Sequence, residues 1–406
     1  MLNRFLIAVS LGIVTCSTCM SARAGRITIS DAPETNVKVR PPARVPFELY
    51  LNSLIFLQAR VNGSEPMWFV LDSASTFSFL DAGKAEALGI KAENRDSITG
   101  SGGGSIEIAF GKGASLDISG VKLTDQTFAI TQWRNKYDRN VVGMIGAPFF
   151  KQFVVEIDYQ AKNLTLHNPQ TYTYTGKGSS LPLEFSEEIP AVRVGMTFRT
   201  GSSSEAKLDL DTGAGQTIIL NTAFVESHKL LSSTEGMLKF EAGSLAGKVS
   251  YFTGRSKTVT LGGFALESVL TNFSGQGGMK VRAGIDGVIG NWLLKRFRVI
   301  LDCSHRRMIL EPSDLFPVAT DFEMTGLSLV REGAQFKIDH VFRGSLAEGA
   351  GLHAGDVLVA IDNRSASQMN LIQLRQMFKQ DGSKLALTIK RGAETLWVTL
   401  HMLEIR

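Results

Sequence analysis

The sequence predicts a mainly β protein built from three units, of which the first two are copies of one another. Short β-branched and aromatic runs alternate with turn signals, and the 406 residues include 40 glycines. A segment at 143–166 recurs at 287–310, which indicates a duplication. We expect the two copies at 46–167 and 182–312, and a third unit with a different pattern of helices and strands at 322–404.

The N-terminus has the features of an export signal. Arg4 precedes an apolar run at 5–14, and small residues at 22–24 follow it. A short apolar core between a basic start and a small-residue cleavage site is typical of a secretory signal peptide. We therefore expect a signal peptide at 1–24, a linker at 25–45 and an exported protein, either periplasmic or secreted.

The cysteines bear on anchoring and on disulfides. Cys16 and Cys19 lie inside the expected signal and raise the alternative of a lipoprotein anchor. Thr15 and Thr18 disfavour that alternative, because such signals have Gly, Ala or Ser at those positions. Cys303 is the only cysteine beyond the signal, so we expect no internal disulfide and an inert thiol.

Charge and hydropathy argue against two classes of partner. Removing 1–24 takes away two of the 43 basic residues and none of the 39 acidic residues, which leaves a net charge of +2. This balance argues against nucleic acid and anionic lipid as partners. No later stretch is long and apolar enough to predict a transmembrane span.

The histidines predict no metal site, and we expect no cofactor. They show no paired ligand spacing, and no predicted helix carries two of them. The six are His167, His228, His305, His340, His353 and His401. We interpret all of them as surface or core residues.

Two matching stretches place an aspartate directly after a predicted strand. Asp72 follows an apolar run in "MWFVLDSASTFSFLD", residues 67–81, and Asp211 follows a strand in "AKLDLDTGAGQTIIL", residues 206–220. A charge beside a buried strand costs free energy unless it is paired or hydrogen-bonded. Small residues follow both aspartates: Ser73, Ala74 and Ser75 in the first copy, and Thr212, Gly213 and Ala214 in the second.

The common role of an aspartate beside serines is to cap a turn. For Asp72 alone that interpretation would be favoured, but the recurrence at Asp211 favours a shared chemical role. Asp158 and Asp302 also correspond between the copies, yet each ends a predicted strand and precedes a turn. We expect these two to be structural.

A second shared element lies later in each copy. "GMIGAPFFKQFVVEIDYQAKNLTL" at 143–166 aligns with "GVIGNWLLKRFRVILDCSHRRMIL" at 287–310. Each begins with hydrophobic residues before a glycine: Ile145 and Gly146 in the first copy, Ile289 and Gly290 in the second. The connection "NPQTYTYTGKGSSL" at 168–181 is polar and rich in turn residues, so we expect a linker there.

Together these motifs resemble the aspartic proteases of the pepsin and retropepsin type. The resemblance implies two tandem retropepsin-like β-barrel lobes that form one bilobal protease, with Asp72 and Asp211 as its catalytic pair. Two carboxylates about 3 Å apart share one proton, so that one activates a water and the other protonates the substrate carbonyl. The substrates would be proteins or peptides. A monomer would suffice, because both lobes lie in one chain.

The resemblance also implies roles for residues around the pair. Ser73 and Thr212 would hold the two loops together, and the elements that end at Gly146 and Gly290 would brace them from behind. "TGSGGGS" at 99–105 lies where the family has a flap over its substrate, and the alternative is an ordinary hairpin loop. The glycines of this flap would be Gly102, Gly103 and Gly104.

Two features make the predicted surroundings of Asp72 differ from those of Asp211. Ala74 stands where the family has glycine, and its methyl group would crowd the partner loop. Ser75 has a hydroxyl that would donate to the outer oxygen of Asp72, whereas Ala214 offers none to Asp211. We hypothesise that Asp72 is the more acidic partner.

The third unit resembles a PDZ domain. "SLAEGAGLHAGDVLVAIDN" at 345–363 has the helix-turn-strand signature of such domains, and "TGLSLV" at 325–330 resembles their carboxylate-binding loop. The peptide-binding residues that this implies are Gly326, Leu327, Ser328 and Leu329. The ligand would be a C-terminal peptide added as a strand. The alternative is a domain that packs on the protease and regulates access.

Two functions follow from this interpretation. The first is an exported aspartic endopeptidase whose PDZ domain recruits substrates or partners. The second is a peptide-binding protein whose lobes no longer cleave, an alternative that Ala74 keeps open.

Overall fold

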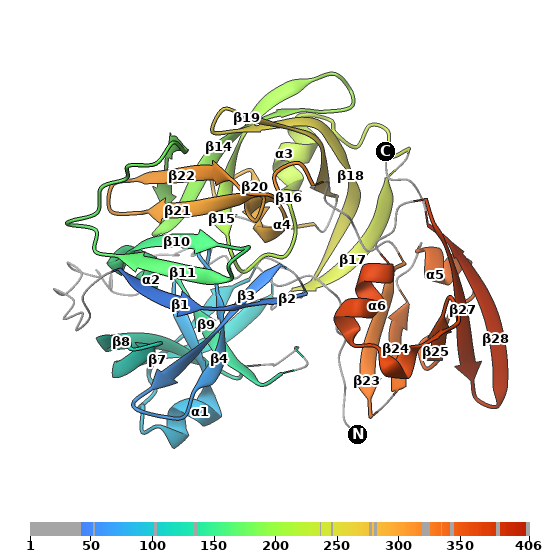
Figure 1. Ribbon diagram of the computed structural model, residues 1–406, viewed down its shortest axis with the longest axis horizontal. Helices are drawn as coiled ribbons and strands as arrows, with labels where there is room; N and C mark the ends of the chain where they lie inside the picture. Colours follow the sequence, from blue (N-terminus) through green and yellow to red (C-terminus); the bar gives the residue numbers. More distant parts are fainter. Residues whose placement is uncertain are drawn as a thin grey trace.

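The computed structural model describes residues 42–402, apart from 52, 101–103, 134–136, 138, 236, 245–246, 276–277, 280–281, 319–324, 334, 342–344 and 379–381. The expected signal peptide at 1–24, with Cys16 and Cys19, and most of the expected linker at 25–45 lie outside these residues. Figure 1 shows two β lobes above and below a central sheet, with a third unit beside them. No helix in the described part of the chain is long and apolar enough to cross a membrane.

The first lobe is a closed barrel of six strands. The strands are hydrogen-bonded in the order β3-β4-β9-β5-β8-β7, and β7 pairs again with β3. Strand β2 extends the sheet beyond β3, and β6 extends it beyond β7. The bounds are β2 Glu48–Tyr50, β3 Leu54–Val61, β4 Met67–Leu71, β5 Ser78–Asp81, α1 Ala82–Ala87, β6 Glu93–Thr99, β7 Ser105–Ile118, β8 Val121–Thr131 and β9 Val141–Ile145.

The second lobe repeats this barrel strand for strand. Its order is β14-β15-β20-β16-β19-β18, and β18 closes it by pairing with β14. The bounds are β13 Glu184–Ser186, β14 Ile189–Thr197, β15 Ser203–Asp211, β16 Ile218–Leu220, α3 Thr222–Ser227, β17 Leu238–Ser244, β18 Gly247–Leu261, β19 Phe264–Ser274, β20 Gly287–Gly290 and α4 Asn291–Leu294. The predicted fold of two tandem β-barrel lobes is confirmed.

Glycines let the strands of each barrel approach closely. A Cβ added at Gly143 in β9 would lie 2.0 Å from the carbonyl oxygen of Phe79. A Cβ at Gly287 in β20 would lie at the same distance from the carbonyl oxygen of Ile219. These distances exclude any side chain, so the glycines shared by the two copies have the same steric cause.

A six-stranded sheet joins the lobes, in the order β1-β11-β10-β21-β22-β12, with three strands from each copy. At its centre β10 and β21 are antiparallel, with Glu156 opposite Ile300. The bounds are β1 Ala43–Pro46, α2 Ala147–Gln152, β10 Val154–Asp158, β11 Asn163–His167, β12 Ser179–Pro182, β21 Phe297–Asp302 and β22 Arg307–Pro312. Strands β1 and β12 begin inside the segments expected as linkers at 25–45 and 168–181, because they pair with β11 and β22.

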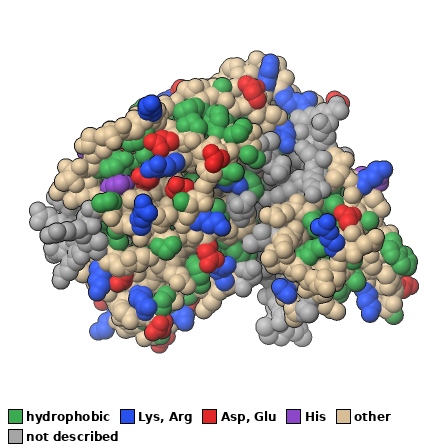
Figure 2. Space-filling model, viewed as in Figure 1, with side chains coloured by type: hydrophobic (Ala, Val, Ile, Leu, Met, Phe, Trp, Pro, Cys, Tyr) green, Lys and Arg blue, Asp and Glu red, His purple; other side chains and the backbone are tan. Residues whose placement is uncertain are grey.

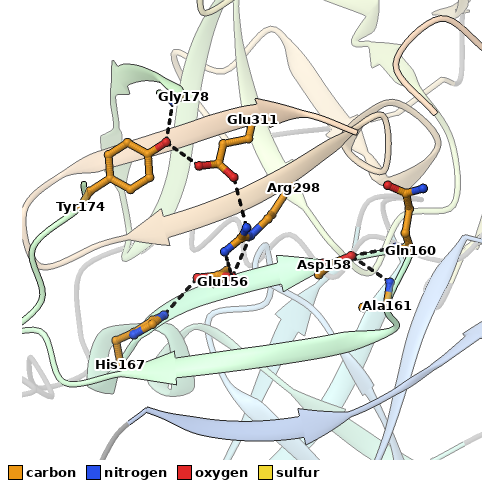
Figure 3. Close-up of polar contacts among 9 residues, drawn as sticks. All are labelled: Glu156, Asp158, Gln160, Ala161, His167, Tyr174, Gly178, Arg298 and Glu311. Atoms are coloured by element: carbon orange, nitrogen blue, oxygen red, sulfur yellow. Dashed lines mark hydrogen bonds and ion pairs between the residues drawn. The ribbon is translucent and has the colours of Figure 1, made fainter. Parts of the chain in front are cut away.

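A polar network crosses one face of this sheet, as Figure 3 shows. Arg298 of β21 donates to Glu156 of β10, with Nε 2.7 Å from Oε1, and lies 3.3 Å from Glu311. The Tyr174 hydroxyl donates to Glu311 at 2.6 Å, and His167 lies 3.1 Å from Glu156. Burial raises the pKa of Glu156, but hydrogen bonds from His167 and Arg298 hold it below its ordinary value. The network therefore ties strands of both lobes and the connecting segment together.

The third unit has its own sheet and core. The sheet order is β23-β24-β25-β27-β28, with the short β26 paired to β25. Leu270 of β19 belongs to the same apolar cluster, so this unit packs against the second lobe there. The bounds are β23 Leu327–Glu332, β24 Gln335–Val341, α5 Leu346–Gly349, β25 Val357–Ile361, β26 Arg364–Ser365, a 3₁₀ turn Ala366–Gln368, α6 Leu371–Met377, β27 Lys384–Arg391 and β28 Glu394–His401.

The surface view in Figure 2 agrees with the charge balance of the sequence. Acidic and basic side chains are interspersed over the visible face of the two lobes and of the third unit. No broad patch of one sign covers this face.

Candidate active site

The two predicted catalytic aspartates lie at equivalent strand ends of the two barrels. Asp72 follows β4, and Asp211 is the last residue of β15. Their side chains are buried, with 1% and 0% exposed. Strand β4 runs parallel to β9, with Leu71 opposite Ile145, and β15 runs parallel to β20, with Asp211 opposite Gly290. Each carboxylate therefore stands at the end of a parallel pair.

Four hydrogen bonds join the loops that follow the two aspartates. The Ser73 amide donates to Thr212 Oγ1 at 2.9 Å, and the Thr212 amide donates to Ser73 Oγ at 3.1 Å. The hydroxyls donate onward to the opposite strands, Ser73 to the Leu210 carbonyl at 2.6 Å and Thr212 to the Leu71 carbonyl at 2.9 Å. Because these buried groups satisfy one another across the lobes, the loops have one relative position.

Backbone amides orient both carboxylates in the same way. The Ala74 amide donates to Asp72 Oδ1 at 2.9 Å, and the Gly213 amide donates to Asp211 Oδ1 at 2.9 Å. A Cβ added at Gly213 would lie 2.4 Å from Asp72 Oδ2. The carboxyl group of the first lobe therefore lies against the loop of the second.

Ala74 occupies the position in the first loop that Gly213 occupies in the second. It is buried, and neither residue has a positive φ. The backbone conformation at this position is therefore open to an L side chain. Glycine is required at 213 because Asp72 takes the space of a side chain there.

The two hydrophobic-hydrophobic-Gly elements lie directly behind the loops. A Cβ at Gly146 would lie 2.6 Å from the Ser75 carbonyl oxygen, and one at Gly290 would lie 2.7 Å from that of Ala214. The amide that follows each glycine donates to the same carbonyl, at 2.7 Å and 2.9 Å respectively. The isoleucines before the glycines, Ile145 and Ile289, are buried in the shared core of the lobes.

A buried ion pair that the sequence analysis missed lies beneath the second loop. Asp209 is two residues before Asp211 on β15, so the two side chains share one face of the strand. Arg282 Nη2 donates to Asp209 Oδ1 at 2.6 Å, and both side chains are almost fully buried. The corresponding residue of the first lobe is Val70. The available signal was the alternation in "LDLDTG", which places two carboxylates on one face.

Burial raises the pKa of Asp211 well above its ordinary value, and the charge of Asp72 raises it further. The hydrogen bond from the Gly213 amide opposes this rise. Burial also raises the pKa of Asp209 to about 6, while Arg282 opposes the rise. Burial and the charge of Asp72 thus disfavour the charged form of Asp211, in a pair that titrates as a unit.

The expected hydrogen bond from Ser75 to Asp72 is not formed. A serine hydroxyl has one proton, and Ser75 Oγ donates it to the Phe77 carbonyl at 2.7 Å within the same turn. The expectation was wrong because this nearby carbonyl competes with the carboxylate. A difference in acidity between Asp72 and Asp211 must therefore have another origin.

A hairpin occupies the region where a flap was expected. Strand β6 pairs with β7, and the Gly100 amide donates to the Gly104 carbonyl at 3.0 Å. Gly102 and Gly103 lie outside the described residues. The second lobe has the corresponding hairpin of β17 and β18, which the sequence analysis did not predict.

The predicted peptide-binding loop of the third unit lies at the start of β23. Gly326 has a φ of 67°, and the side chains of Leu327 and Leu329 are buried in the core of this unit. The backbone of Ser328 pairs with His340 of β24. Among the described strands, β23 pairs with β24 alone, which leaves one edge for an added strand.

The other aspartates that correspond between the copies cap turns. Asp158 accepts hydrogen bonds from the amides of Gln160 and Ala161, which Figure 3 shows beside the polar network. Asp302 accepts from the His305 amide at 3.3 Å and from the Arg307 side chain at 2.8 Å. These contacts are structural, as expected from their places at strand ends.

The remaining predictions concern the cysteine and a metal site. Burial raises the pKa of the Cys303 thiol to about 12, so the thiolate is not formed near neutral pH. Within the part of the chain that the structure describes, no three His, Cys, Asp or Glu side chains are grouped to hold a metal ion.

Comparison with known proteins finds family models that match two of the three units, the first lobe and the third unit. Residues 57–149 match the family model described as aspartyl protease, and residues 322–390 match the model described as PDZ domain. Comparison with curated proteins finds no match. The aspartic proteinase from Irpex lacteus is a similar solved structure, with 17% identity, 69% of this chain and 99% of that chain covered, and a TM-score of 0.45. That likeness is too low to support a conclusion.

The first lobe therefore matches the aspartyl protease family, in its retropepsin-like form, and the third unit is a PDZ domain. The second lobe lies beyond the matched range but has the strand order of the first.

Proposed function

We propose that this protein is an aspartic-type endopeptidase in which Asp72 and Asp211 form one catalytic pair. The observation that supports the proposal is the reciprocal hydrogen bonding of Ser73 and Thr212, which joins the two loops that follow the buried carboxylates of the two lobes. The match of the first lobe to the aspartyl protease family supports a hydrolase. One chain supplies both carboxylates, so a monomer suffices.

In the proposed reaction, ionised Asp72 accepts a proton from a water whose oxygen bonds to the carbonyl carbon of the scissile peptide. Asp211 donates its proton to the carbonyl oxygen, which gives a tetrahedral diol. The C–N bond then breaks as Asp72 passes its proton to the leaving nitrogen, and a diol proton returns to Asp211. We assign the initial proton to Asp211 because burial and the charge of Asp72 raise its pKa.

The PDZ domain and the N-terminal segment extend this proposal. The edge of β23 that pairs with no other described strand would receive the C-terminal strand of a protein substrate or partner. The signal-like residues 1–24 support export to the periplasm or beyond the cell. Isothermal titration with peptides that end in a free or an amidated carboxyl group tests the PDZ role. Binding of neither peptide would leave a domain that regulates access.

The central experiment is a digest of a denatured protein library by the wild type, Asp72→Asn and Asp211→Asn, read by mass spectrometry across pH. Each substitution keeps the side-chain shape but removes the titrating group, so we expect losses of at least about 10²-fold. Full activity of Asp72→Asn would contradict the two-lobe pair. A folded wild type that binds peptides without cleaving them would instead be a peptide-binding protein.

A further inference from the structure

The loop after Asp211 has a side-chain connection to the first lobe. Asn291 Nδ2 donates to the carbonyl oxygen of Thr212, and the Tyr159 hydroxyl donates to Asn291 Oδ1 at 2.7 Å. Tyr159 directly follows β10 of the first lobe, whereas Asn291 is the first residue of α4 in the second. The connection therefore crosses from one lobe to the catalytic loop of the other.

Burial makes the direction of these hydrogen bonds unambiguous. Asn291 and Thr212 are 0% exposed and Tyr159 is 3% exposed. The Thr212 carbonyl can only accept, so Asn291 presents its nitrogen there and its oxygen to Tyr159. Burial raises the pKa of Tyr159, which keeps its hydroxyl protonated and able to donate.

The connection continues to the Asp211 carboxylate through one peptide group. The Thr212 carbonyl and the Gly213 amide belong to the same peptide, and this amide donates to Asp211 Oδ1 at 2.9 Å. A peptide whose carbonyl accepts a hydrogen bond becomes a better donor at its N–H. A stronger donor to a carboxylate favours the charged form. Tyr159 and Asn291 thus act on Asp211 in series.

The first lobe has different residues at both corresponding positions. In the duplicated segments, Asn291 aligns with Ala147, and Tyr159 aligns with Cys303. An alanine methyl group cannot donate to the Ser73 carbonyl as Asn291 does to that of Thr212. The two catalytic loops share their backbone contacts, but this side-chain connection belongs to the second loop.

We propose that Tyr159 and Asn291 are positioning residues that orient the Thr212–Gly213 peptide toward the Asp211 carboxylate and thereby stabilise its charged form. The inference rests on the proposed function for its consequence in catalysis. Other charges also act on Asp211: Asp72 across the lobe interface and Asp209 on the same strand face, itself paired with Arg282. The test must therefore leave these charges in place.

The test is the pH dependence of kcat/KM for Asn291→Ala, Tyr159→Phe and the double variant. Either loss weakens the Gly213 donor, so Asp211 holds its proton to higher pH. We expect the high-pH limb of the profile to move up by on the order of half a pH unit. Because the two groups act in series, the double variant should move no further than Asn291→Ala.

Tyr174→Phe is the matched control, since it removes a tyrosine hydroxyl that bonds Glu311 and Gly178 on the outer face of the central sheet. Both limbs should stay in place in this variant. The inference would be overturned if Asn291→Ala lowered the thermal stability but left both limbs of the pH profile in place. It would also be overturned if the shifts of the two single variants added up in the double variant.

A readout without turnover separates this inference from the proposed function. Titration of the Asp211 carboxyl carbon by NMR in selectively labelled protein should show the same upward shift in Asn291→Ala and Tyr159→Phe. A wild type that does not cleave would contradict the proposed function, while an Asp211 titration identical in all variants would contradict the inference.

Discussion

The two lobes have the same strand order and the same loop contacts, yet they differ in the side chains beneath the aspartates. Below the Asp72 loop, Val70 belongs to an apolar cluster with Tyr50 and Phe56. At the corresponding place in the second lobe, Asp209 pairs with Arg282. The comparison teaches that the glycines and the reciprocal hydrogen bonds determine the geometry of the two loops. The residues below the loops differ, with an apolar side chain in the first lobe and a buried ion pair in the second.

The polar character of the second lobe continues along β18 and β19. Thr253 donates to Asn272 at 2.7 Å, and the hydroxyls of Ser256 and Thr271 lie 2.8 Å apart, all of them buried. The corresponding strands of the first lobe bury apolar residues: Ile108, Ala109, Phe128 and Ala129. The second lobe thus has buried polar groups at Thr271 and Asn272 where the first lobe has Phe128 and Ala129, while both lobes keep an apolar core.

The largest expected effect is the loss of stability when only one member of the Asp209–Arg282 ion pair is replaced by an apolar residue. Asp209→Val or Arg282→Met alone leaves one buried charge without its partner, so we expect each to lower the free energy of unfolding by about 3–5 kcal/mol. The double variant restores an apolar pair and should recover most of this loss. Urea unfolding of all four proteins measures the cycle, and equal losses in single and double variants would contradict the account.

Ala74 and Gly213 occupy corresponding positions after the two aspartates, and we expect a substitution to be tolerated at Ala74 but not at Gly213. Gly213→Ala places a Cβ 2.4 Å from Asp72 Oδ2, which must displace the carboxylate. We expect kcat/KM to fall by about 10²-fold, since misplacement by about 1 Å has that effect. Ala74→Gly removes a methyl group and should keep the activity within a few-fold. Similar losses in both variants would show that the loops are equally crowded.

The stability of the second lobe should depend on pH through Asp209. Its pKa is about 6 in the folded protein and 3.8 ordinarily, so the folded state binds the extra proton between these values. Stability should therefore fall as pH rises through this window, by at most about 1.4 kcal/mol per pH unit for one proton. Urea unfolding from pH 3.5 to 7 should show this slope in the wild type and a smaller one in Asp209→Asn. Identical slopes would contradict the assignment.

The smallest expected effect on stability is that of a substitution in the polar network of the central sheet, to which both lobes contribute strands. Glu156→Gln weakens the contacts with Arg298 and His167. The Arg298 side chain is 43% exposed, so solvent screens the pair, and we expect a loss of about 1 kcal/mol or less in unfolding free energy. The pH profile of cleavage should not change. A loss of activity as large as that of Gly213→Ala would mean that this network determines how the lobes align.

Duplication explains which features could be predicted from the sequence. The Asp72 and Asp211 loops with the strands before them, and the bracing glycines, had a second copy for comparison, and all of them occupy equivalent places in the structure. Contacts that exist in one lobe had no such counterpart, because Asn291 aligns with an alanine and Asp209 with a valine. The Ser75 expectation was wrong because the direction of a hydroxyl depends on the local turn, which residue type does not determine.

The central claim is that two lobes of one chain supply one catalytic pair. Its most direct test is the cleavage rate of Asp72→Asn and Asp211→Asn, measured separately and after mixing with each other over a range of concentrations. We predict no cleavage by either variant and none by the mixture, because no chain in it holds both carboxylates. Recovery of activity on mixing would show a site shared between chains, and full activity of either variant alone would show that the pair is not required.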